Sequence, residues 1–357
     1  MKKIKIAILG LAHPHAAALY RTFALWPDEV EFLGYADVPP YDDMPHEERK
    51  RYLGKAGIEA LREYADWREL VALGPDLAIV TTDNRACGDL CCELLSRGIA
   101  VVNEKPMTMD YADAKRVAAC SKQYGVPVIT NWPIAWFPSF RTAKKLADEG
   151  RIGRVMRVAY RSPATWGPFS YGRSVEDKAS SWWYRHERGG GSVLDYACYG
   201  TILATWFFGR RAERVSAITK NFTVGFSDVE DYSAMMLDFG DGVGLLEGSW
   251  STFNCGQVPT GPVIYGTEGT IVCDRYSNLV KIYIGADHKP VEPVEVIDAG
   301  EAQQIELLGR NILDFLAGRA ELDEMLRLDI NMDVVAALDA GLRSTASGQF
   351  EQVEKGE

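Results

Sequence analysis

The sequence lacks an apolar run long enough to cross a membrane. Its longest apolar runs, such as residues 4–9 and 77–80, have the length of a strand, whereas a membrane span needs roughly 18 residues or more. The short run near the N-terminus is interrupted by Lys5 and is followed directly by His13-Pro14-His15. It therefore predicts a first buried strand rather than a signal peptide.

The cysteine patterns of secreted and zinc-binding proteins are also missing. The 7 cysteines are an odd number, and they form no C-x-x-C pair and no Cys/His cluster with zinc spacing. His13 and His15 are candidate metal ligands, but no third ligand stands near them in the sequence, so no metal is expected. This cysteine usage is typical of reduced thiols, and we expect a cytoplasmic protein.

Positive charge is scarce as well. The chain has 39 Lys and Arg residues against 50 Asp and Glu residues, which gives a formal net charge of −11 at pH 7. Nucleic acids and anionic membrane surfaces do not attract such a chain, so we expect a small-molecule substrate, no nucleic acid and no membrane. The 357 residues, at about 150 residues per domain, predict two domains.

The first third of the chain alternates short apolar runs with helix-like segments. This alternation, with strands that are apolar throughout, predicts an α/β domain whose parallel sheet is covered by helices on both faces. The charged segment 47–64 also has a helical pattern. The expected strands are residues 4–9, 30–36, 77–81, 100–103 and 127–130, and the expected helices are residues 14–25, 67–72, 86–97 and 111–124.

The pattern changes after Asn131. An apolar helix over residues 192–208 is followed by longer strands with little helix between them, and Gly240-Asp241-Gly242 predicts a hairpin turn. We therefore expect one domain over residues 1–131 and a second over residues 132–357, with a large, mostly antiparallel open sheet. An exposed face of such a sheet favours a homodimer or homotetramer. The other expected elements are strands at 155–160, 215–222, 232–239, 243–250, 263–265, 270–273 and 280–284, and helices at 139–149, 302–316 and 330–348, the last packing back on the first domain.

The turn after the first strand reads Gly10-Leu11-Ala12-His13-Pro14-His15. A full dinucleotide-binding fingerprint is G-x-G-x-x-G, and only Gly10 is kept, with Ala12 and His15 in the other two glycine places. Ala12 is small enough for a pyrophosphate to approach the backbone, and the following helix offers its N–H groups and the positive end of its dipole. The motif fits a phosphate loop and, equally, an ordinary strand-to-helix turn.

Asp37 favours the phosphate loop. It stands at the end of the second predicted strand, where an acidic residue binds the ribose hydroxyls of NAD. The next three residues contain no Arg or Lys for a 2′-phosphate, so NAD is favoured over NADP. The alternative is that Asp37 only starts a turn.

Two segments far apart in the sequence carry candidate catalytic side chains. Lys105 follows a predicted strand of the parallel sheet, and such folds bind ligands at the carboxyl ends of their strands. Asp195 and Tyr199 stand four residues apart in the apolar helix, so they share one helical face. Gly189-Gly190-Gly191 lets the chain approach a ligand closely, and Ser192 is a candidate cap for the helix.

These motifs together resemble the Gfo/Idh/MocA oxidoreductase family over nearly the whole chain. The resemblance rests on Glu104-Lys105-Pro106-Met107, on residues 189–195 and on residues 264–270. It implies an N-terminal Rossmann domain with a doubly wound parallel sheet and a C-terminal α/β substrate domain. It also implies hydride transfer between NAD or NADP and a carbinol carbon of a sugar, polyol or cyclic diol.

The resemblance implies roles for single residues. Lys105 and Asp195 correspond to the lysine and aspartate of the family's motifs, and Tyr199 stands where many members have His. Tyr in this place is similar to the subset with glucose–fructose oxidoreductase, xylose dehydrogenase and dimeric dihydrodiol dehydrogenase. Residues 82–87 resemble the family's T-P-N-x-x-H segment, with Asp for Pro and Cys for His. The implied cofactor-binding residues are Gly10, Ala12, His13, His15, Asp37, Thr82, Asn84, Glu104 and Lys105.

The implied chemistry is a hydride transfer coupled to a proton transfer. NAD accepts the hydride, and the hydroxyl proton must leave with it. A tyrosine pKa of about 10 is lowered by a neighbouring ammonium, so Tyr199 is the expected base, Lys105 its partner, and Asp195 the group that orients the substrate or Lys105. The alternatives are a Tyr199 buried in the core, an NAD-binding sensor or regulator without catalysis, and an NAD-dependent glycosidase.

Polar and aromatic side chains near these motifs are candidates for the substrate site. Aromatic rings with a polar edge suit the mixed faces of a sugar ring. Core packing or a subunit interface is the alternative for each aromatic residue. The expected substrate residues are Asn131, Trp132, Arg161, Trp183 and His186, with Trp136, Trp166, Trp182 and Tyr184 in the same aromatic group.

Overall fold

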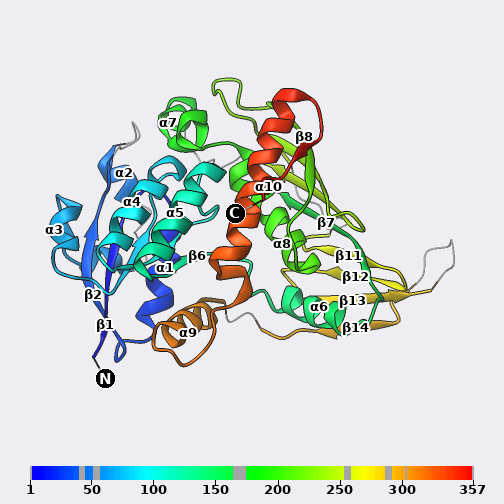
Figure 1. Ribbon diagram of the computed structural model, residues 1–357, viewed down its shortest axis with the longest axis horizontal. Helices are drawn as coiled ribbons and strands as arrows, with labels where there is room; N and C mark the ends of the chain where they lie inside the picture. Colours follow the sequence, from blue (N-terminus) through cyan, green and yellow to red (C-terminus); the bar gives the residue numbers. More distant parts are fainter. Residues whose placement is uncertain are drawn as a thin grey trace. The chain divides into compact units, whose positions relative to one another are not determined.

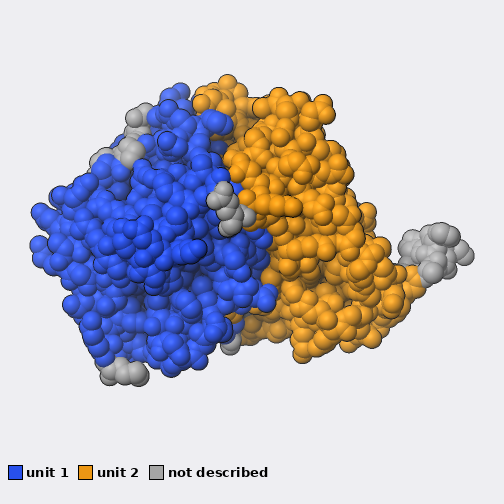
Figure 2. Space-filling view, in the orientation of Figure 1, with its two compact units in different colours: residues 1–132, 173–190, 305–335 blue, residues 133–172, 191–304, 336–357 orange. Residues whose placement is uncertain are grey.

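The computed structural model describes residues 2–39, 45–50, 57–163, 174–252, 259–285, 292–301 and 304–355 (Figure 1). The chain forms two compact units (Figure 2). Unit 1 contains residues 1–132, 173–190 and 305–335, and unit 2 contains residues 133–172, 191–304 and 336–357. Each unit thus uses three segments of chain, whereas the sequence predicted a single boundary after residue 131. Within the described ranges, no helix is both long and apolar enough to span a membrane.

Unit 1 contains a parallel sheet of strands β1 (Ile4–Leu9), β2 (Val30–Ala36), β3 (Glu63–Tyr64), β4 (Leu77–Val80), β5 (Ala100–Asn103) and β6 (Val128–Thr130). The strand order is β3-β2-β1-β4-β5-β6, and every neighbouring pair is parallel. The order reverses between β1 and β4, which is the point where doubly wound sheets bind ligands beyond their carboxyl ends. The predicted doubly wound sheet is confirmed.

The helices of unit 1 are α1 (His15–Ala24), α2 (His46–Lys50), α3 (Trp67–Val71), α4 (Asn84–Ser96), α5 (Tyr111–Tyr124), α7 (Val175–Ser180) and α9 (Gln304–Leu316). Three of them, α3, α4 and α5, begin at aspartates whose carboxylates cap the helix, and at α3 Asp66 accepts the N–H of Arg68. Asp83 accepts the N–H of Ala86 at the start of α4, and Asp110 accepts the N–H of Asp113 at the start of α5. α4 and α5 then pack side by side (Figure 1).

Within the described residues, the helical pattern predicted over residues 47–64 forms an α-helix at residues 47–50 only and is wrong for residues 57–64. α2 covers residues 46–50, residues 58–60 form a 3₁₀ turn, and residues 63–64 form β3 beside β2, while residues 51–56 lie outside the described residues. Tyr64 is buried against Gly34 of β2, where a Cβ atom would approach the tyrosine ring to 2.7 Å. Pairing with β2 decides this segment, because strand formation depends on neighbours that helical periodicity does not report.

Unit 2 contains a sheet of strands β7 (Val155–Pro163), β8 (Arg214–Lys220), β9 (Tyr232–Asp238), β10 (Val243–Ser249), β11 (Val263–Gly266), β12 (Gly269–Cys273), β13 (Leu279–Ile284), β14 (Glu295–Asp298) and β15 (Glu351–Gln352). Their order is β14-β13-β12-β11-β7-β10-β9-β8-β15. β10 runs parallel to β7, and the other described pairs are antiparallel, including the predicted β9–β10 hairpin. The pattern did not predict β14 and β15 because both are short strands at the edges.

Helices α6 (Pro138–Asp148) and α8 (Cys198–Phe208) pack on the unit 2 sheet, and α10 (Leu328–Ser347) has residues in both units (Figure 1). The apolar helix predicted over residues 192–208 forms with one difference, because Val193–Ala197 is a π-helical turn that precedes α8. Ser192 does not cap it; the Ser192 hydroxyl donates to that of Ser233 at 3.2 Å. π-helical turns are rare and occur frequently at functional sites.

Candidate functional site

The turn between β1 and α1 lies tight against the end of β4. Gly10 has a φ of +93°, and a Cβ atom there would lie 2.8 Å from backbone atoms of Thr81 and Thr82, so only glycine fits. The N–H of Ala12 donates to the Thr81 carbonyl at 3.0 Å, and the Ala12 carbonyl accepts the indole N–H of Trp182 at 2.8 Å. This close approach of backbone to backbone favours the phosphate-loop interpretation.

Polar side chains from three segments of unit 1 meet at the carboxyl end of β5. Glu104 Oε2 lies 2.8 Å from Nδ1 of His15, and Glu104 Oε1 accepts the side-chain N–H of Asn131 at 2.6 Å. The backbone N–H of His15 donates to Nδ1 of His13 at 3.1 Å. These four residues belong to three separate segments of the sequence, and the fold joins them into one hydrogen-bonded set, here called the Glu104 network (His13, His15, Glu104 and Asn131).

Lys105 lies beside this network. Its side chain is buried, with 3% of the residue exposed. Burial lowers the pKa of His13 well below its usual 6.5, and the charges of His15 and Lys105 lower that pKa further. His13 is therefore a neutral imidazole at physiological pH, and Lys105 brings a positive charge to the carboxyl end of β5.

This edge of the sheet fits a nicotinamide dinucleotide. A buried polar atom normally has a hydrogen-bond partner, yet Oδ1 of Asn103 and Oδ1 of Asn131 have none among the described residues. Asn103 ends β5 and Asn131 follows β6, so both acceptors lie at the carboxyl ends of strands, where doubly wound sheets bind their ligands. Together with the Gly10 turn and the acidic Asp37, they supply the kinds of group that such a cofactor needs.

The structure brings a third possible metal ligand, Glu104, close to His13 and His15. His13, His15 and Glu104 bring one ligand atom each to within 4.8 Å of one another. Two contacts oppose a cation there. The neutral His13 accepts a hydrogen bond at Nδ1 and so carries its proton on Nε2, and the ammonium of Lys105 is close enough to lower the pKa of His13. The three groups therefore fit a cofactor site better than a metal site.

The carboxylate of Asp37 makes more contacts than the sequence indicated. Its Oδ1 accepts the N–H groups of Leu11 and Val38 at 3.1 and 3.0 Å, and Arg49 Nε donates to its Oδ2 at 2.7 Å. His46 Nδ1 lies 3.6 Å from the same oxygen. The three residues after Asp37 contain no Arg or Lys, but the fold places Arg49 of α2 beside the end of β2. A guanidinium in this place is the group that accommodates a 2′-phosphate.

We expect Asp37→Ala to weaken NAD binding by about 10-fold or more and to improve the relative affinity for NADP. The substitution removes the predicted acceptor for the ribose hydroxyls and takes away one carboxylate partner of Arg49. Titrations with both cofactors measure the change. The double variant Asp37→Ala/Arg49→Ala is the matched control and should not show the improved relative affinity for NADP. An unchanged ratio of the two affinities in Asp37→Ala would contradict the ribose role.

Residues 82–84 bind a second segment of unit 1. Asn84 donates its side-chain N–H to the Gly189 carbonyl at 2.8 Å, and Arg188 Nη2 lies 2.5 Å from Asp83 Oδ2. A Cβ atom at Gly189 would lie 2.6 Å from the Cβ atom of Asn84. Asp83, which stands where the family has Pro, therefore caps α4 and also holds the chain that leads into the glycine run.

The expected substrate residues of unit 1 have different surroundings. Trp183 is buried, stacks on Trp182 and lies 4.8 Å from the His13 ring, so it belongs with the Glu104 network. Trp132 is fully buried, and its indole donates to Asn331 at 2.8 Å, which is a core contact. His186 is exposed at the start of a 3₁₀ turn, and Trp166 lies outside the described residues.

Asp195 and Tyr199 lie in unit 2. Asp195 is in the π-helical turn and is 6% exposed, and its Oδ2 accepts the indole N–H of the buried Trp250 at 3.0 Å. Tyr199 is half-buried in the first turn of α8, with its ring 6.1 Å from that of Tyr196. Lys105 belongs to unit 1, so the meeting of Lys105 with these two residues stays a prediction.

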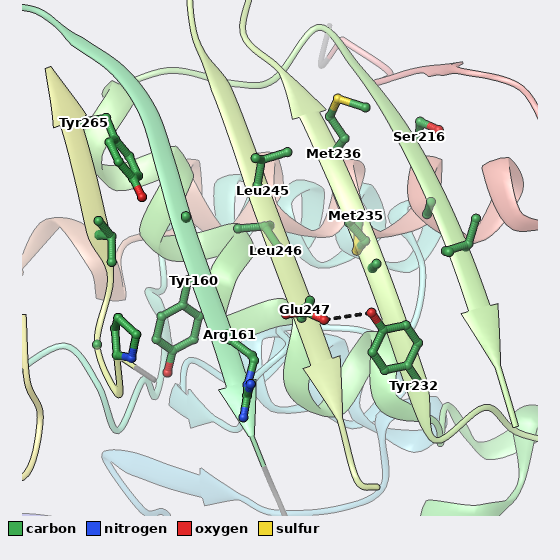
Figure 3. A pocket seen from close by; sticks show the side chains of 17 residues that line it. Tyr160, Arg161, Ser216, Tyr232, Met235, Met236, Leu245, Leu246, Glu247 and Tyr265 are labelled. Carbon is green, nitrogen blue, oxygen red and sulfur yellow. Dashed lines mark hydrogen bonds between the residues drawn. The ribbon is translucent and has the colours of Figure 1, made fainter. Parts of the chain in front are cut away.

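Arg161 lies on the other face of the unit 2 sheet from α8. Leu246 points toward α8, where a Cβ atom at Gly200 would approach it to 2.9 Å. Successive residues of a strand point to opposite faces, so Glu247 and its register partner Arg161 point away. A pocket of about 650 Å³ hollows this open face (Figure 3). In it Tyr232 donates to Glu247 at 2.7 Å, and burial and this bond raise the pKa of Tyr232 to about 12.

Glu230, just before β9, caps the π-helical turn. Its Oε1 accepts the N–H of Val193 at 2.8 Å, and its backbone carbonyl accepts the N–H of Ser192 at 3.1 Å. Burial raises the pKa of this carboxyl to about 7; the neighbouring Asp231 also raises it, while the N–H groups around it act in the opposite direction. Glu230 therefore caps the turn from a distant segment of the chain, the one that leads into β9.

Sequence reasoning missed Arg49, Glu230 and Trp250. Arg49 stands 12 residues after Asp37, well beyond residues 38–40, which directly follow it. Glu230-Asp231 is an acidic pair directly before a predicted strand, and Trp250 ends the strand expected at 243–250. Glu230 and Trp250 are a polar and an aromatic residue near strand ends. Hydrophobic periodicity does not indicate that they bind Val193 and Asp195, which lie 37 and 55 residues away.

We expect Glu230 to make folding stability fall with rising pH. Its folded-state pKa of about 7 lies above the ordinary 4.5, so its contribution is complete below about pH 4.5 and is lost as pH rises through about 7. Glu230→Gln keeps an acceptor oxygen and cannot ionise. Its midpoint of thermal unfolding should equal that of the wild type at pH 5 and exceed it by a few degrees at pH 8. A difference that does not change between these pH values would refute this.

Two stretches of the chain match family models. Residues 4–132 match the Gfo/Idh/MocA model described as an oxidoreductase family with an NAD-binding Rossmann fold. Residues 140–272 match the model of the Gfo/Idh/MocA C-terminal domain. The two matches follow one another along the chain in the order that the sequence motifs implied.

Curated relatives have names from sugar and diol metabolism. Trans-1,2-dihydrobenzene-1,2-diol dehydrogenase of Mus musculus is 23% identical over 235 residues, which is 65% of this chain and 65% of that protein. dTDP-3,4-didehydro-2,6-dideoxy-alpha-D-glucose 3-reductase of Streptomyces violaceoruber is 28% identical over 212 residues, which is 58% of this chain and 55% of that protein. The chain thus spans less than two thirds of the length of either relative.

Solved structures share the fold over the whole chain. Levoglucosan dehydrogenase, in complex with NADH and levoglucosan, has a TM-score of 0.80 at 18% identity and covers 99% of this chain and 100% of its own. The WlbA dehydrogenase from Bordetella pertussis, in complex with NADH and UDP-GlcNAcA, has a TM-score of 0.77 at 20% identity and covers 99% and 100%. At these identities the likeness is one of fold.

Proposed function

Because the chain belongs to the Gfo/Idh/MocA oxidoreductase family, whose first domain binds NAD, we propose that it is an NAD-dependent dehydrogenase of CH–OH groups in sugars, polyols or cyclic diols. The observation that carries the proposal is the Glu104 network with Lys105 beside it. It gathers a buried ammonium, a neutral imidazole and a carboxylate at the carboxyl end of a doubly wound sheet. The named substrates of the relatives, a dihydrodiol and a deoxysugar, support the substrate class.

Each residue of the proposed site has a role that follows from its chemistry. The cofactor, when bound, accepts the hydride. The Gly10–Ala12 turn and the N-terminus of α1 would bind its phosphates, Asp37 would bind the ribose, and His15, Glu104 and Asn131 would hold the nicotinamide end. In this proposal Lys105 binds the substrate oxygen and its charge favours the phenolate of Tyr199, which takes the hydroxyl proton, while Asp195 orients the hydroxyl groups.

The activity is tested with purified protein, NAD and a panel of pentoses, hexoses, inositols and cyclic diols. Growth of the reduced-nicotinamide absorbance with one member of the panel supports the dehydrogenase. Binding of NAD without turnover of any member would favour a sensor or regulator. Release of an aglycone from a glycoside without net cofactor reduction would favour a glycosidase, and either of these two results would overturn the proposal.

We expect Tyr199→Phe to lower kcat by about 10²–10⁴-fold, because it removes the group that takes the proton. The affinity for NAD should stay unchanged, since the proposed cofactor residues lie in unit 1. Tyr196→Phe is the matched control, because Tyr196 is a half-buried tyrosine on the same helical segment. Equal rates for Tyr199→Phe and Tyr196→Phe would refute the role of Tyr199.

We also propose that the chain forms a homodimer or homotetramer through the open face of the unit 2 sheet. Ile218, Met236 and Leu245 are exposed there around the pocket, on three neighbouring strands (Figure 3). An apolar surface on a sheet is the kind of patch that a second copy covers in a symmetric assembly.

Light scattering on an eluting protein peak tests the assembly. Leu245→Lys should shift the native mass toward that of a single chain, because it places a charge in the apolar face. Leu73→Lys, which changes an exposed leucine of unit 1, is the matched control and should leave the mass unchanged. A monomeric wild type, or equal masses for the two variants, would exclude this interface.

We keep the cytoplasm as the proposed location. The six cysteines in the described ranges are free thiols, as expected for a reducing compartment, and Cys255 lies outside these ranges. A fusion to a fluorescent protein that forms its chromophore only in a reducing compartment tests the location.

A further inference from the structure

The start of the helix that carries Asp195 is held by contacts from outside the helix. A helix N-terminus leaves N–H groups without partners inside the helix, and a π-helical turn is an unusual backbone that its surroundings must maintain. Ser192 is in position to cap this turn, but its hydroxyl donates to Ser233. The side chain of Glu230 accepts the N–H of Val193 instead, at 2.8 Å.

Two glycines allow this close packing. A Cβ atom at Gly191, where φ is +103°, would lie 2.5 Å from Oε1 of Glu230. A Cβ atom at Gly248 of β10 would lie 2.5 Å from the backbone nitrogen of Ala197. The π-helical turn therefore lies between the Glu230 carboxylate at its start and the backbone of β10 at its end.

Trp250 reaches the carboxylate of Asp195 itself. Its indole N–H can only donate, and it donates to Asp195 Oδ2 at 3.0 Å with both residues buried. The backbone N–H of Trp250 donates to the Asp231 carbonyl at 2.7 Å. The buried Asp231 is fixed in turn, because its carboxylate accepts the N–H groups of Phe222 and Thr223 at 2.8 and 2.6 Å.

We propose that Glu230 and Trp250 are positioning residues, which hold the π-helical turn so that the carboxylate of Asp195 keeps one orientation toward the substrate. Asp231 links the two, because it follows Glu230 directly and its carbonyl accepts the backbone N–H of Trp250. The three residues are here called the β9–β10 clamp (Glu230, Asp231 and Trp250). The inference rests on the proposed function, because it assigns Asp195 to substrate. Glu230 acts through the backbone of Val193, and Trp250 acts through the side chain of Asp195.

Trp250→Phe tests the contact to Asp195. It keeps an aromatic ring in the core and removes the donor, so kcat should fall about 10- to 100-fold while the affinity for NAD is unchanged. Trp206→Phe, in a buried tryptophan of α8, is the matched control and should keep wild-type kcat. In an Asp195→Asn background, Trp250→Phe should have little further effect, because the two residues act as a pair. Full additivity of the two substitutions would overturn the role of Trp250.

Glu230 is tested by a pair of variants that separate its oxygen from its charge. Glu230→Gln keeps the acceptor for Val193 and should keep kcat within about threefold of the wild type. Glu230→Ala removes the acceptor and should lower kcat about 10-fold or more at an unchanged affinity for NAD. A kcat of Glu230→Gln as low as that of Glu230→Ala would overturn the positioning role. If Glu230→Ala does not fold, a kcat of Glu230→Gln more than about threefold below the wild-type value would overturn it.

Hydrogen exchange separates a failure of the clamp from a failure of the proposed function. The amides of residues 193–199 should exchange faster in Glu230→Ala and in Trp250→Phe than in the wild type or in Trp206→Phe. If the wild type shows no turnover but the two variants show this faster exchange, the proposed dehydrogenase activity is refuted and the clamp keeps a structural role. Unchanged exchange in both variants would refute the clamp, whatever the activity of the wild type.

Discussion

The carboxylate of Glu104 is the contact on which the chemistry of unit 1 depends. One oxygen lies against His15 at the start of α1, and the other accepts a hydrogen bond from Asn131 after β6. A buried carboxylate is costly unless it is hydrogen-bonded, so both bonds are needed to keep it there. Through them Glu104 fixes the segments that surround Lys105, and the Gly10 turn and Trp183 complete the same edge of the sheet.

Departures from the family's motifs have local physical explanations. His15 stands where the fingerprint has its third glycine, and its ring reaches Glu104. Asp83 stands where the family has Pro, and it caps α4 and binds Arg188. Each altered residue makes a contact that the usual residue cannot make. The altered glycine loop therefore keeps the tight turn at Gly10 and gains a contact from His15 to Glu104.

In unit 2, the carboxylate of Asp195 lies in the π-helical turn at the start of an apolar helix. The rest of the helix is buried against β7 and β10, so its own residues supply few polar partners for the turn. The ends of β9 and β10 supply them, through Glu230 at Val193 and Trp250 at Asp195. A polar group in an apolar surrounding thus obtains its partners from elements that are distant in sequence.

The sequence by itself determined the two sheets, most of their strands and the residue types of the site. A continuous apolar run such as residues 77–80 indicates a strand that is buried on both faces, and a strand such as β9, whose residues alternate in burial, is buried on one face. Both patterns are local properties of the sequence. Only the tertiary structure decided that residues 63–64 pair with β2, that Arg49 lies on Asp37, and that Glu104 joins His15 to Asn131. Such contacts bring together groups up to 89 residues apart, and their energy depends on positions in space that no period along the chain encodes.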